Sequence, residues 1–344
     1  MTTFSRRRIL QGAGALSASV LAPHLRAQTA KVIRIGVTTR AESSEGRGAQ
    51  FFADTLSKLS GGKLKAECLY NRDSGKLNDA KGSMYQALLA DRVNIVVAPT
   101  TQAVDAIGAK DMALWDMPFM FNNTKEVDAV LDGPIGQKML DKLATTSGLQ
   151  GLCYWENGFR QFCSTDKPLE NIEDFKGVKI RVIPNPIYTA VFKTLGATPV
   201  SIAFDKVYDA FKNQEITAAE ISFGPAYDKK WHEFIKFFSI SNYVYSPYMV
   251  SSSKKWWDAL TADERQQIQA ALVAARDAQR GFARKAEGEA MEAMKAAGVT
   301  VRKLDWGQNH RISERLVRIS STIARDVGMT PWMDVNLALN KMRG

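Results

Sequence analysis

The spacing of apolar residues predicts alternating strands and helices over the first part of the chain. Residues 32–37 are rich in β-branched side chains, and 93–98 are nearly all apolar, which is typical of a parallel strand buried on both faces. Between them, 49–59 carry apolar side chains three or four positions apart, as one face of a helix does. A strand over 64–70 and a helix over 79–92 complete a β-α-β-α-β unit. This order predicts a doubly wound α/β lobe.

The same alternation continues through the middle of the chain. Two further helices and a strand are predicted over 125–131, 135–146 and 149–155. A second set of elements begins at residue 159, with strands and helices over 178–183, 186–195, 204–213 and 215–221. Two such sets predict two lobes, and 344 residues are enough for two separate cores.

One long helical pattern dominates the last third of the chain. It follows a β-prone stretch over 243–250, and it starts at Thr261 with Glu264 three positions on, which is a capping box. The pattern continues to Ala297. A helix of roughly 37 residues at about 1.5 Å each is longer than one lobe is wide. We therefore expect this helix to bridge the two lobes.

The first 27 residues have the features of an export signal. A basic segment, Ser5–Leu10, precedes a modest apolar stretch that ends at Ala22, and Leu25–Ala27 offers a small residue before a cleavage point. The adjacent arginines resemble a twin-arginine signal. Because the apolar stretch is shorter than the ~20 residues that span a bilayer, we expect export to the periplasm as a soluble protein.

Charge and cysteine usage exclude several classes of protein. Of the 46 basic residues, four lie in the export segment, which leaves 42 against 36 acids. The remaining charges are interspersed, so no nucleic-acid partner is expected. The cysteines Cys68, Cys153 and Cys163 have no metal-ligand spacing with the histidines. A Cys153–Cys163 bridge and a pair of buried free thiols both remain open.

Motifs of known enzymes are missing from the sequence. We find no GxSxG, HExxH or GxGxxG pattern, no nucleotide-binding loop, and no pair of acids marked out for acid–base catalysis. The sequence therefore predicts no catalytic residues, no metal site and no cofactor, and we expect a protein that is not an enzyme.

Several short motifs, taken in chain order, resemble those of one transport family. They are Ser60–Leu64, Asp116–Phe121, Asn157–Arg160, Phe175–Val182, Leu195–Pro199 and Val207–Phe211. In this order, and behind an export signal, they resemble the solute-binding subunit of tripartite ATP-independent periplasmic (TRAP) transporters, the DctP-like family. The resemblance runs over nearly all of the chain after the export segment.

The resemblance implies a two-lobed periplasmic binding protein whose clamp closes on a ligand between the lobes. Lobe I would hold 28–156, with a return over 246–285 that includes the bridging helix. Lobe II would hold 157–245 and the C-terminal part, 286–344. The partners implied are a small carboxylate and the TRAP membrane permease, with monomer as the expected state. A periplasmic sensor partner that presents ligand to a receptor is the alternative function, ahead of an exported enzyme.

The resemblance also implies which charged residues hold the ligand. Arg181 would be the main clamp, because a planar guanidinium fits a carboxylate and an ammonium does not. It would lie near the carboxyl end of a strand, where open α/β sheets bind ligands. Arg160 would be a second cation or a residue that holds the hinge. Glu220 would hold an arginine, contact a ligand amine or hydroxyl, or help ligate a cation.

Four uncharged residues complete the predicted site. Phe204 would form an apolar wall or a staple before the next helix. Thr100 and Thr101 follow a buried strand, so their hydroxyls would reach the cleft or cap a helix. Trp155 lies at the first crossing between lobes, where it would either contact ligand or pack in the core.

One departure from the family pattern bears on the ligand. The family often has an asparagine that contacts sugar acids where this chain has Ile221. That difference argues against a polyhydroxy ligand. We expect an organic monocarboxylate, such as a 2-oxo, hydroxy or aromatic acid, with a C4-dicarboxylate as the next choice.

Overall fold

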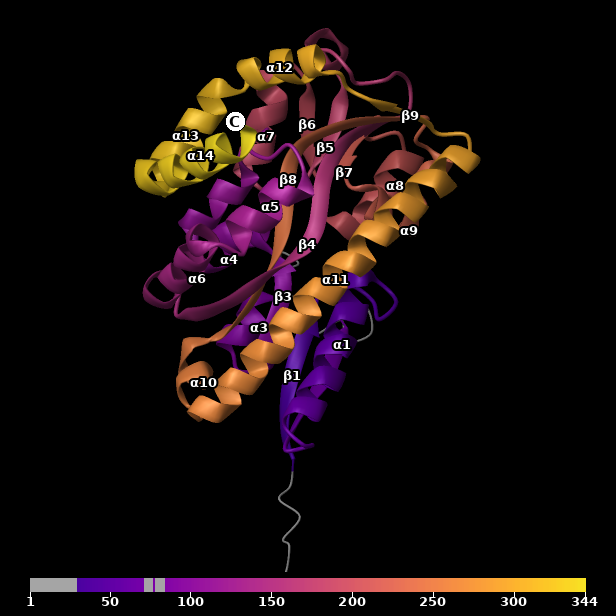
Figure 1. The fold of residues 1–344 in the computed structure, drawn as a ribbon. Helices are drawn as coiled ribbons and strands as arrows, with labels where there is room; N and C mark the ends of the chain where they lie inside the picture. Colours follow the sequence, from indigo (N-terminus) through magenta and orange to yellow (C-terminus); the bar gives the residue numbers. More distant parts are fainter. Residues whose placement is uncertain (1–29, 71–76, 78–83) are drawn as a thin grey trace, which may run out of the picture.

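In the part of the chain that the computed structural model describes, residues 30–70, 77 and 84–344, one nine-stranded mixed sheet runs from end to end (Figure 1). The strand order is β2-β1-β3-β8-β4-β7-β5-β6, with β9 beside β8. The predicted export segment 1–27 lies outside the described residues. The strands are β1 Lys31–Val37, β2 Leu64–Tyr70, β3 Ile95–Pro99, β4 Leu149–Ser164, β5 Lys179–Val182, β6 Thr198–Ser201, β7 Ala218–Ile221, β8 Phe237–Ser253 and β9 Thr300–Lys303.

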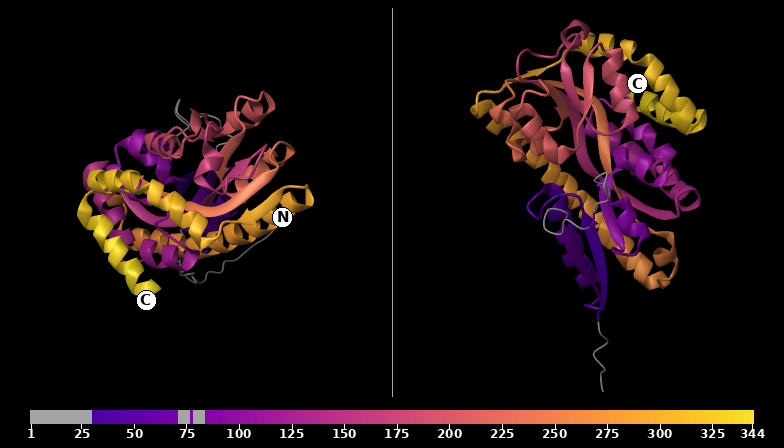
Figure 2. Two further views of the ribbon diagram at one scale, coloured as in Figure 1. Left: turned by 90° about the horizontal axis from the view of Figure 1, so that it is seen from above. Right: turned by 180° about the vertical axis from the view of Figure 1, so that it is seen from behind.

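Helices cover both halves of this sheet, as the views from above and behind show (Figure 2). The predicted helices 125–131, 135–146 and 186–195 are confirmed within a residue. The predicted helix 204–213 is split into a 3₁₀ turn, η4 Phe204–Lys206, and the helix α8 Val207–Lys212. The helices are α1 Ser44–Leu59, α3 Tyr85–Leu89, α4 Ala103–Ile107, α5 Thr124–Leu131, α6 Pro134–Thr146, α7 Pro186–Thr194, α8 Val207–Lys212, α9 Phe223–Asp228, α10 Lys254–Asp258, α11 Ala262–Ala296, α12 Trp306–Arg315, α13 Val317–Val327 and α14 Met329–Arg343. Short 3₁₀ turns include η1 Thr100–Gln102, η2 Lys110–Asp116 and η4 Phe204–Lys206.

Two long antiparallel strands, β4 and β8, join the halves of the sheet. They pair from Leu149 opposite Ser253 to Ser164 opposite Phe237, with register shifts around Glu156–Phe159. Gly158 has φ of 96° at this irregularity, a conformation that glycine adopts without strain. The sequence predicted separate strands on either side of residue 157. The chain stays extended there, so the two lobes share one sheet.

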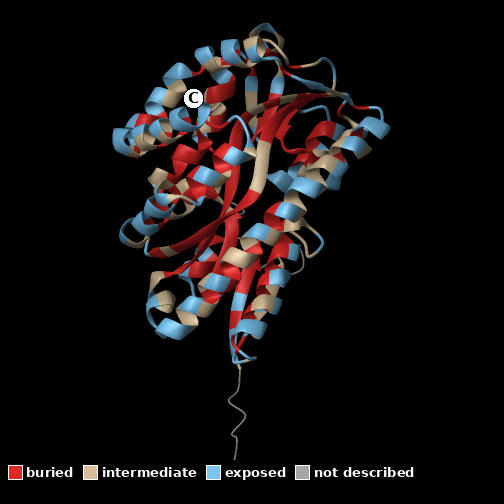
Figure 3. Ribbon diagram, in the orientation of Figure 1, coloured by how far each residue is buried: buried red, intermediate tan, exposed pale blue. Residues whose placement is uncertain are grey.

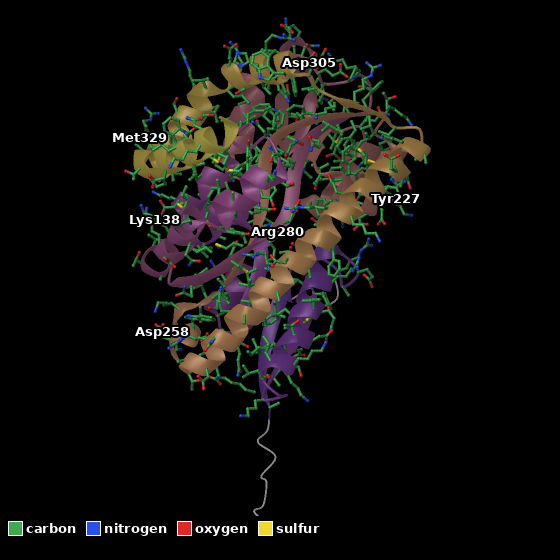
Figure 4. The ribbon with its side chains drawn as sticks, viewed as in Figure 1. Lys138, Tyr227, Asp258, Arg280, Asp305 and Met329 are labelled. Carbon is green, nitrogen blue, oxygen red and sulfur yellow. The ribbon has the colours of Figure 1, made fainter. Side chains whose placement is uncertain are left out.

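The long helix α11 contacts both halves, as predicted. Its capping box is present, since Thr261 Oγ1 accepts from Glu264 N at 3.2 Å and Thr261 N donates to Glu264 Oε2 at 2.9 Å. Near its middle, where Figure 4 labels Arg280, Gln279 binds both the N–H and the carbonyl of Glu156 at 2.8 and 2.7 Å. Further along, Glu287 accepts the backbone N–H groups at the start of α9. The helix is therefore fastened to the crossing strand β4 and to α9.

Four buried apolar clusters fill the two halves, and Figure 3 shows this burial along the central strands. We call the half around β1, β2 and β3 lobe I, and the half around β5, β6 and β7 lobe II. Helices α13 and α14 bury Ile323, Val327 and Leu339 in a lobe I cluster. The sequence predicts 286–344 in lobe II, and an amphipathic helix does not by itself reveal which core its apolar face covers. The predicted limits of the lobes stay a prediction.

The cysteines of the described residues are free thiols. Cys153 and Cys163 are both buried, and both lie in the continuous strand β4. Ten residues of strand separate their Cα atoms by roughly 30 Å, far beyond the ~7 Å limit for a disulfide. The bridge that the sequence left open is therefore excluded within one molecule.

Candidate functional site

Arg181 is a buried arginine on an inner strand of lobe II. Strand β5 lies between β6 and β7, and Ile180 and Val182 on either side of Arg181 enter an apolar cluster. Side chains alternate along a strand, so Arg181 points to the opposite face of the sheet. Only 1% of it is exposed, and its Nε donates to Ile202 O at 2.9 Å.

The guanidinium of Arg181 is incompletely paired. Its Nη1 is buried and finds no hydrogen-bond partner among the residues that the structure describes. Burial lowers the pKa of Arg181 to about 10, and the negative charge of Glu220 offsets part of that decrease. A buried guanidinium with an unused donor is costly for the fold unless an anion pairs with it.

Arg160 lies on β4 and is already paired. Its guanidinium forms a buried ion pair with Glu220 on the neighbouring strand β7, through Nε to Oε2 and through Nη2 to Oε1 at 2.8 Å. Nη2 also donates to Glu220 O at 2.8 Å, and the Tyr243 hydroxyl donates to Oε2 at 2.6 Å. The pair raises the pKa of Arg160 above its ordinary range, although burial opposes the rise. Of the roles predicted for Glu220, holding an arginine is the one that these contacts describe.

These three groups form one electrostatic unit. The charges of Glu220 and Arg160 both act on Arg181, with opposite signs. Since one carboxylate stands against two guanidiniums, the unit keeps one positive charge in excess. The unit is therefore suited to bind an anionic ligand that contacts Arg181.

Two of the remaining predicted site residues, Thr100 and Thr101, lie in lobe I next to its contact with lobe II. Thr100 is fully buried and its hydroxyl donates to Pro247 O at 3.3 Å, so that hydroxyl is engaged by the protein. Thr101 is 5% exposed, and its carbonyl accepts from Asn185 of lobe II at 3.0 Å. Both threonines begin η1, directly after β3.

Trp155 and Phe204 lie in different surroundings from each other. Trp155 is fully buried within a lobe I cluster that includes residues of β1, α1 and α11. Phe204 is 37% exposed, its ring centroid lies 5.9 Å from that of Trp231, and the Lys229 ammonium lies 5.1 Å from its centre. Trp155 packs in the core, and its buried indole Nε1 finds no hydrogen-bond partner among the described residues.

Sequence reasoning missed three polar residues next to this unit. Tyr188 of α7 donates its hydroxyl to Asp116 Oδ1 at 3.0 Å, and its ring centre lies 5.6 Å from Arg160 Cζ. Asn185, the cap of α7, donates to Asp116 Oδ2 at 3.4 Å. Asp116 belongs to a motif that the sequence analysis quoted, but no spacing in the sequence linked it to α7.

An ion pair also joins the two lobes elsewhere, closer to solvent. Arg40, in the loop after β1, lies 2.7 Å from Asp228 at the end of α9. Glu45 shapes that loop by accepting Thr38 N at 2.7 Å and the Thr39 hydroxyl at 2.8 Å. The side chains of Arg40 and Asp228 remain 34% and 44% exposed, so this pair contributes at most about 1 kcal/mol.

Asp116 makes a testable contribution to pH dependence. Burial raises its pKa to about 7, while the bond from Tyr188 and the charge of Arg160 limit the rise. The folded protein therefore binds this proton more tightly than the unfolded chain, whose aspartates titrate near 4. The stabilisation is complete below about pH 4 and is lost as the pH rises toward 7, by up to ~1.4 kcal/mol per unit. Asp116→Asn should flatten this part of the decline in unfolding free energy, measured by urea denaturation.

The matched control for that experiment is Asp141→Asn. Asp141 is exposed on α6 and accepts from Gln137 one turn earlier. Its replacement should leave the slope between pH 4.5 and 7 as in the wild type. Equal slopes for Asp116→Asn and the wild type would show that Asp116 does not titrate in this range.

Comparisons with known proteins place the chain in one family. The model of bacterial extracellular solute-binding protein family 7, DctP, matches residues 35–324. The C4-dicarboxylate-binding periplasmic protein DctP of Rhodobacter capsulatus is 30% identical over 297 residues, covering 86% of each chain. The 2,3-diketo-L-gulonate-binding periplasmic protein YiaO of Escherichia coli is 28% identical over 292 residues, covering 85% of each.

Solved structures of solute-binding proteins are also similar to this chain. The sugar-acid-binding protein DctPAm of Advenella mimigardefordensis, in complex with galactonate, is 31% identical with a TM-score of 0.82, covering 91% of this chain and 98% of that one. A TRAP periplasmic solute-binding protein of Ochrobactrum anthropi is 28% identical with a TM-score of 0.84, covering 92% of this chain and 96% of that one.

These similarities confirm the predicted two-lobed α/β fold with a bridging helix. No helix within the described ranges is long and apolar enough to cross a bilayer. The chain belongs to bacterial extracellular solute-binding protein family 7, the DctP family of TRAP solute-binding proteins.

Proposed function

We propose that this protein is the periplasmic subunit of a TRAP transporter that captures a small organic carboxylate and delivers it to the membrane permease. It binds its ligand without chemical turnover, and we expect it to act as a monomer. The clamp would close around the acid by a hinge motion of its two lobes. The permease would then receive the acid from the closed form.

The observation that carries this proposal is the unused Nη1 donor of Arg181. A carboxylate placed there would complete the hydrogen bonds of a buried cation and neutralise the excess charge of the unit it forms with Arg160 and Glu220. The named relatives support the same class of ligand, since they carry a C4-dicarboxylate, a diketo sugar acid and galactonate in their names.

Within that class we favour a monocarboxylate. Ile221 is buried in an apolar cluster of lobe II, so it offers no polar group to the hydroxyls of a sugar acid. Below about pH 7, where Asp116 is protonated, one excess positive charge also matches one carboxylate better than two. Succinate and galactonate are therefore the informative competitors to pyruvate, lactate and benzoate.

A thermal-shift screen with these five acids tests the proposal. An acid at 100 times its dissociation constant should stabilise the fold by about 2.7 kcal/mol. We expect pyruvate, lactate or benzoate to give the largest rise in Tm, and the purified protein to leave the acid chemically unchanged. If no carboxylate shifts the Tm while an uncharged sugar or an amine does, the proposal is wrong.

A further inference from the structure

Three polar side chains outside the arginine unit meet where the lobes touch. Asp116 ends η2 in lobe I, and its neighbours Trp115 and Met117 belong to a lobe I cluster. Asn185 and Tyr188 lie at the start of α7 in lobe II. All three are buried, with Asp116 fully enclosed, Tyr188 1% exposed and Asn185 4% exposed. Buried polar groups of this kind need partners, and here the partners lie in the opposite lobe.

The donors come from lobe II and the acceptors from lobe I. The Tyr188 hydroxyl and the Asn185 amide donate to the two carboxyl oxygens of Asp116, at 3.0 and 3.4 Å. The same amide donates to Thr101 O at 3.0 Å. Asn185 Oδ1 faces the other way and accepts from Ile187 N at 2.8 Å, so one side chain both caps α7 and contacts lobe I. The two surfaces are complementary in their hydrogen-bonding groups.

This contact also leads to the arginine unit. The ring of Tyr188 lies beside Arg160, and the charge of Arg160 acts on Asp116. Asp116 is therefore placed to fix the ring against which the Arg160 guanidinium rests. A lobe motion that separates η2 from the start of α7 would move the carboxyl away from the hydroxyl and the amide.

We propose that Asp116, Asn185 and Tyr188 are positioning residues that form an inter-lobe clasp, made when the clamp closes and broken when it opens. In the open form these groups would bind water. In the closed form they would bind one another and hold Tyr188 against Arg160. The role of the clasp in ligand capture rests on the proposed function, but its opening and closing do not require a ligand.

The variant that tests the clasp is Tyr188→Phe, which removes one hydroxyl and keeps the ring. Its matched control is Tyr154→Phe. Tyr154 is equally buried, but among the described residues its hydroxyl bonds only within lobe I. It accepts from Trp115 Nε1 at 3.3 Å and lies 3.5 Å from Gly136 O and 3.9 Å from Met112 Sδ as acceptors. Loss of either hydroxyl should lower the Tm by a similar amount, so Tm alone does not distinguish the two roles.

The decisive readout is the distance between the lobes. Spin labels at Lys58→Cys on α1 and Lys212→Cys on α8 report this distance by pulsed electron paramagnetic resonance, in a Cys68→Ser background because Cys68 is partly exposed. Spectra are taken without ligand and at increasing sucrose, which favours the more compact form. One buried hydrogen bond corresponds to about a fivefold to tenfold change in the ratio of closed to open forms.

We expect Tyr188→Phe to lower that ratio fivefold to tenfold, whereas Tyr154→Phe keeps the wild-type distribution. Asn185→Ser, which keeps a capping oxygen and removes the amide donor, should act like Tyr188→Phe. For the acid that gives the largest Tm shift, the half-saturating concentration should rise by the same factor in both clasp variants. Distance distributions equal to the wild type in Tyr188→Phe and Asn185→Ser would show that these contacts are a fixed part of the fold. If no acid binds the wild type, the proposed function fails, and the ligand-free distances still decide the clasp.

Discussion

Arg181→Met is expected to weaken carboxylate binding at least about 30-fold while leaving the ligand-free fold as stable as the wild type or more so. Truncating one partner of a buried charge pair costs about 2–5 kcal/mol of binding. In the ligand-free protein the same guanidinium is buried with an unused donor, and burial lowers its pKa to about 10. Replacing such a group by an apolar side chain of similar length removes its desolvation cost, so the ligand-free stability should stay equal or rise. Calorimetric titration and urea denaturation measure the two effects.

Arg280→Met is the control for this variant. Arg280 is also buried, but both its Nη atoms pair with Asp132, at 2.6 and 2.9 Å. Its loss removes one of the two guanidiniums that pair with Asp132, the other being Arg276 at 3.2 Å, so it should lower stability and leave the intrinsic preference for carboxylates intact. A destabilised Arg181→Met protein with wild-type affinity would mean that Arg181 serves the fold and not the ligand.

Glu220→Ala is expected to destabilise the protein by about 3–5 kcal/mol, the largest stability effect among these variants. The substitution leaves the Arg160 guanidinium buried without its carboxylate and removes the acceptor of the Tyr243 hydroxyl. Breaking a buried pair by removing one partner carries this cost. Urea denaturation at neutral pH, with Glu314→Ala on the exposed face of α12 as control, measures it.

A double replacement separates charge from packing. Arg160→Met with Glu220→Leu removes both charges, so it should recover most of the stability lost in Glu220→Ala. It should not recover wild-type binding, because the arrangement around Arg181 is changed. If the double variant is as unstable as Glu220→Ala, the loss comes from packing around the pair and not from an uncompensated charge.

Much of the fold follows from periodic patterns in the sequence. Helix α11 is predicted closely because Thr261 and Glu264 mark its start and its apolar spacing continues for many turns. The continuity of β4 is not predictable in the same way. Gly158 suggests a turn, and pairing with the similarly long β8 keeps residues 156–159 in the sheet. The assignment of α13 and α14 to a core likewise depends on tertiary packing that amphipathicity does not specify.

Some residues of the candidate site are likewise predictable from the sequence, and others are not. Arg160, Arg181 and Glu220 were predicted through the family motifs, and the contact between Arg160 and Glu220 agrees with one of the roles considered for the acid. Asp116 and Tyr188 were missed because they lie 72 residues apart and meet only after folding. A buried polar contact between distant segments has no signature in local spacing. The contacts between the lobes at Asp116 and Tyr188 are therefore seen only in the structure.

The most direct test of the central claim is a crystal structure of the protein with the acid that gives the largest thermal shift. We predict a carboxylate oxygen about 2.8 Å from Arg181 Nη1, the distance of a charge-assisted hydrogen bond, with the Arg160–Glu220 pair retained. A bound acid whose carboxylate is held by another cation, with Arg181 Nη1 still without a partner, would contradict it.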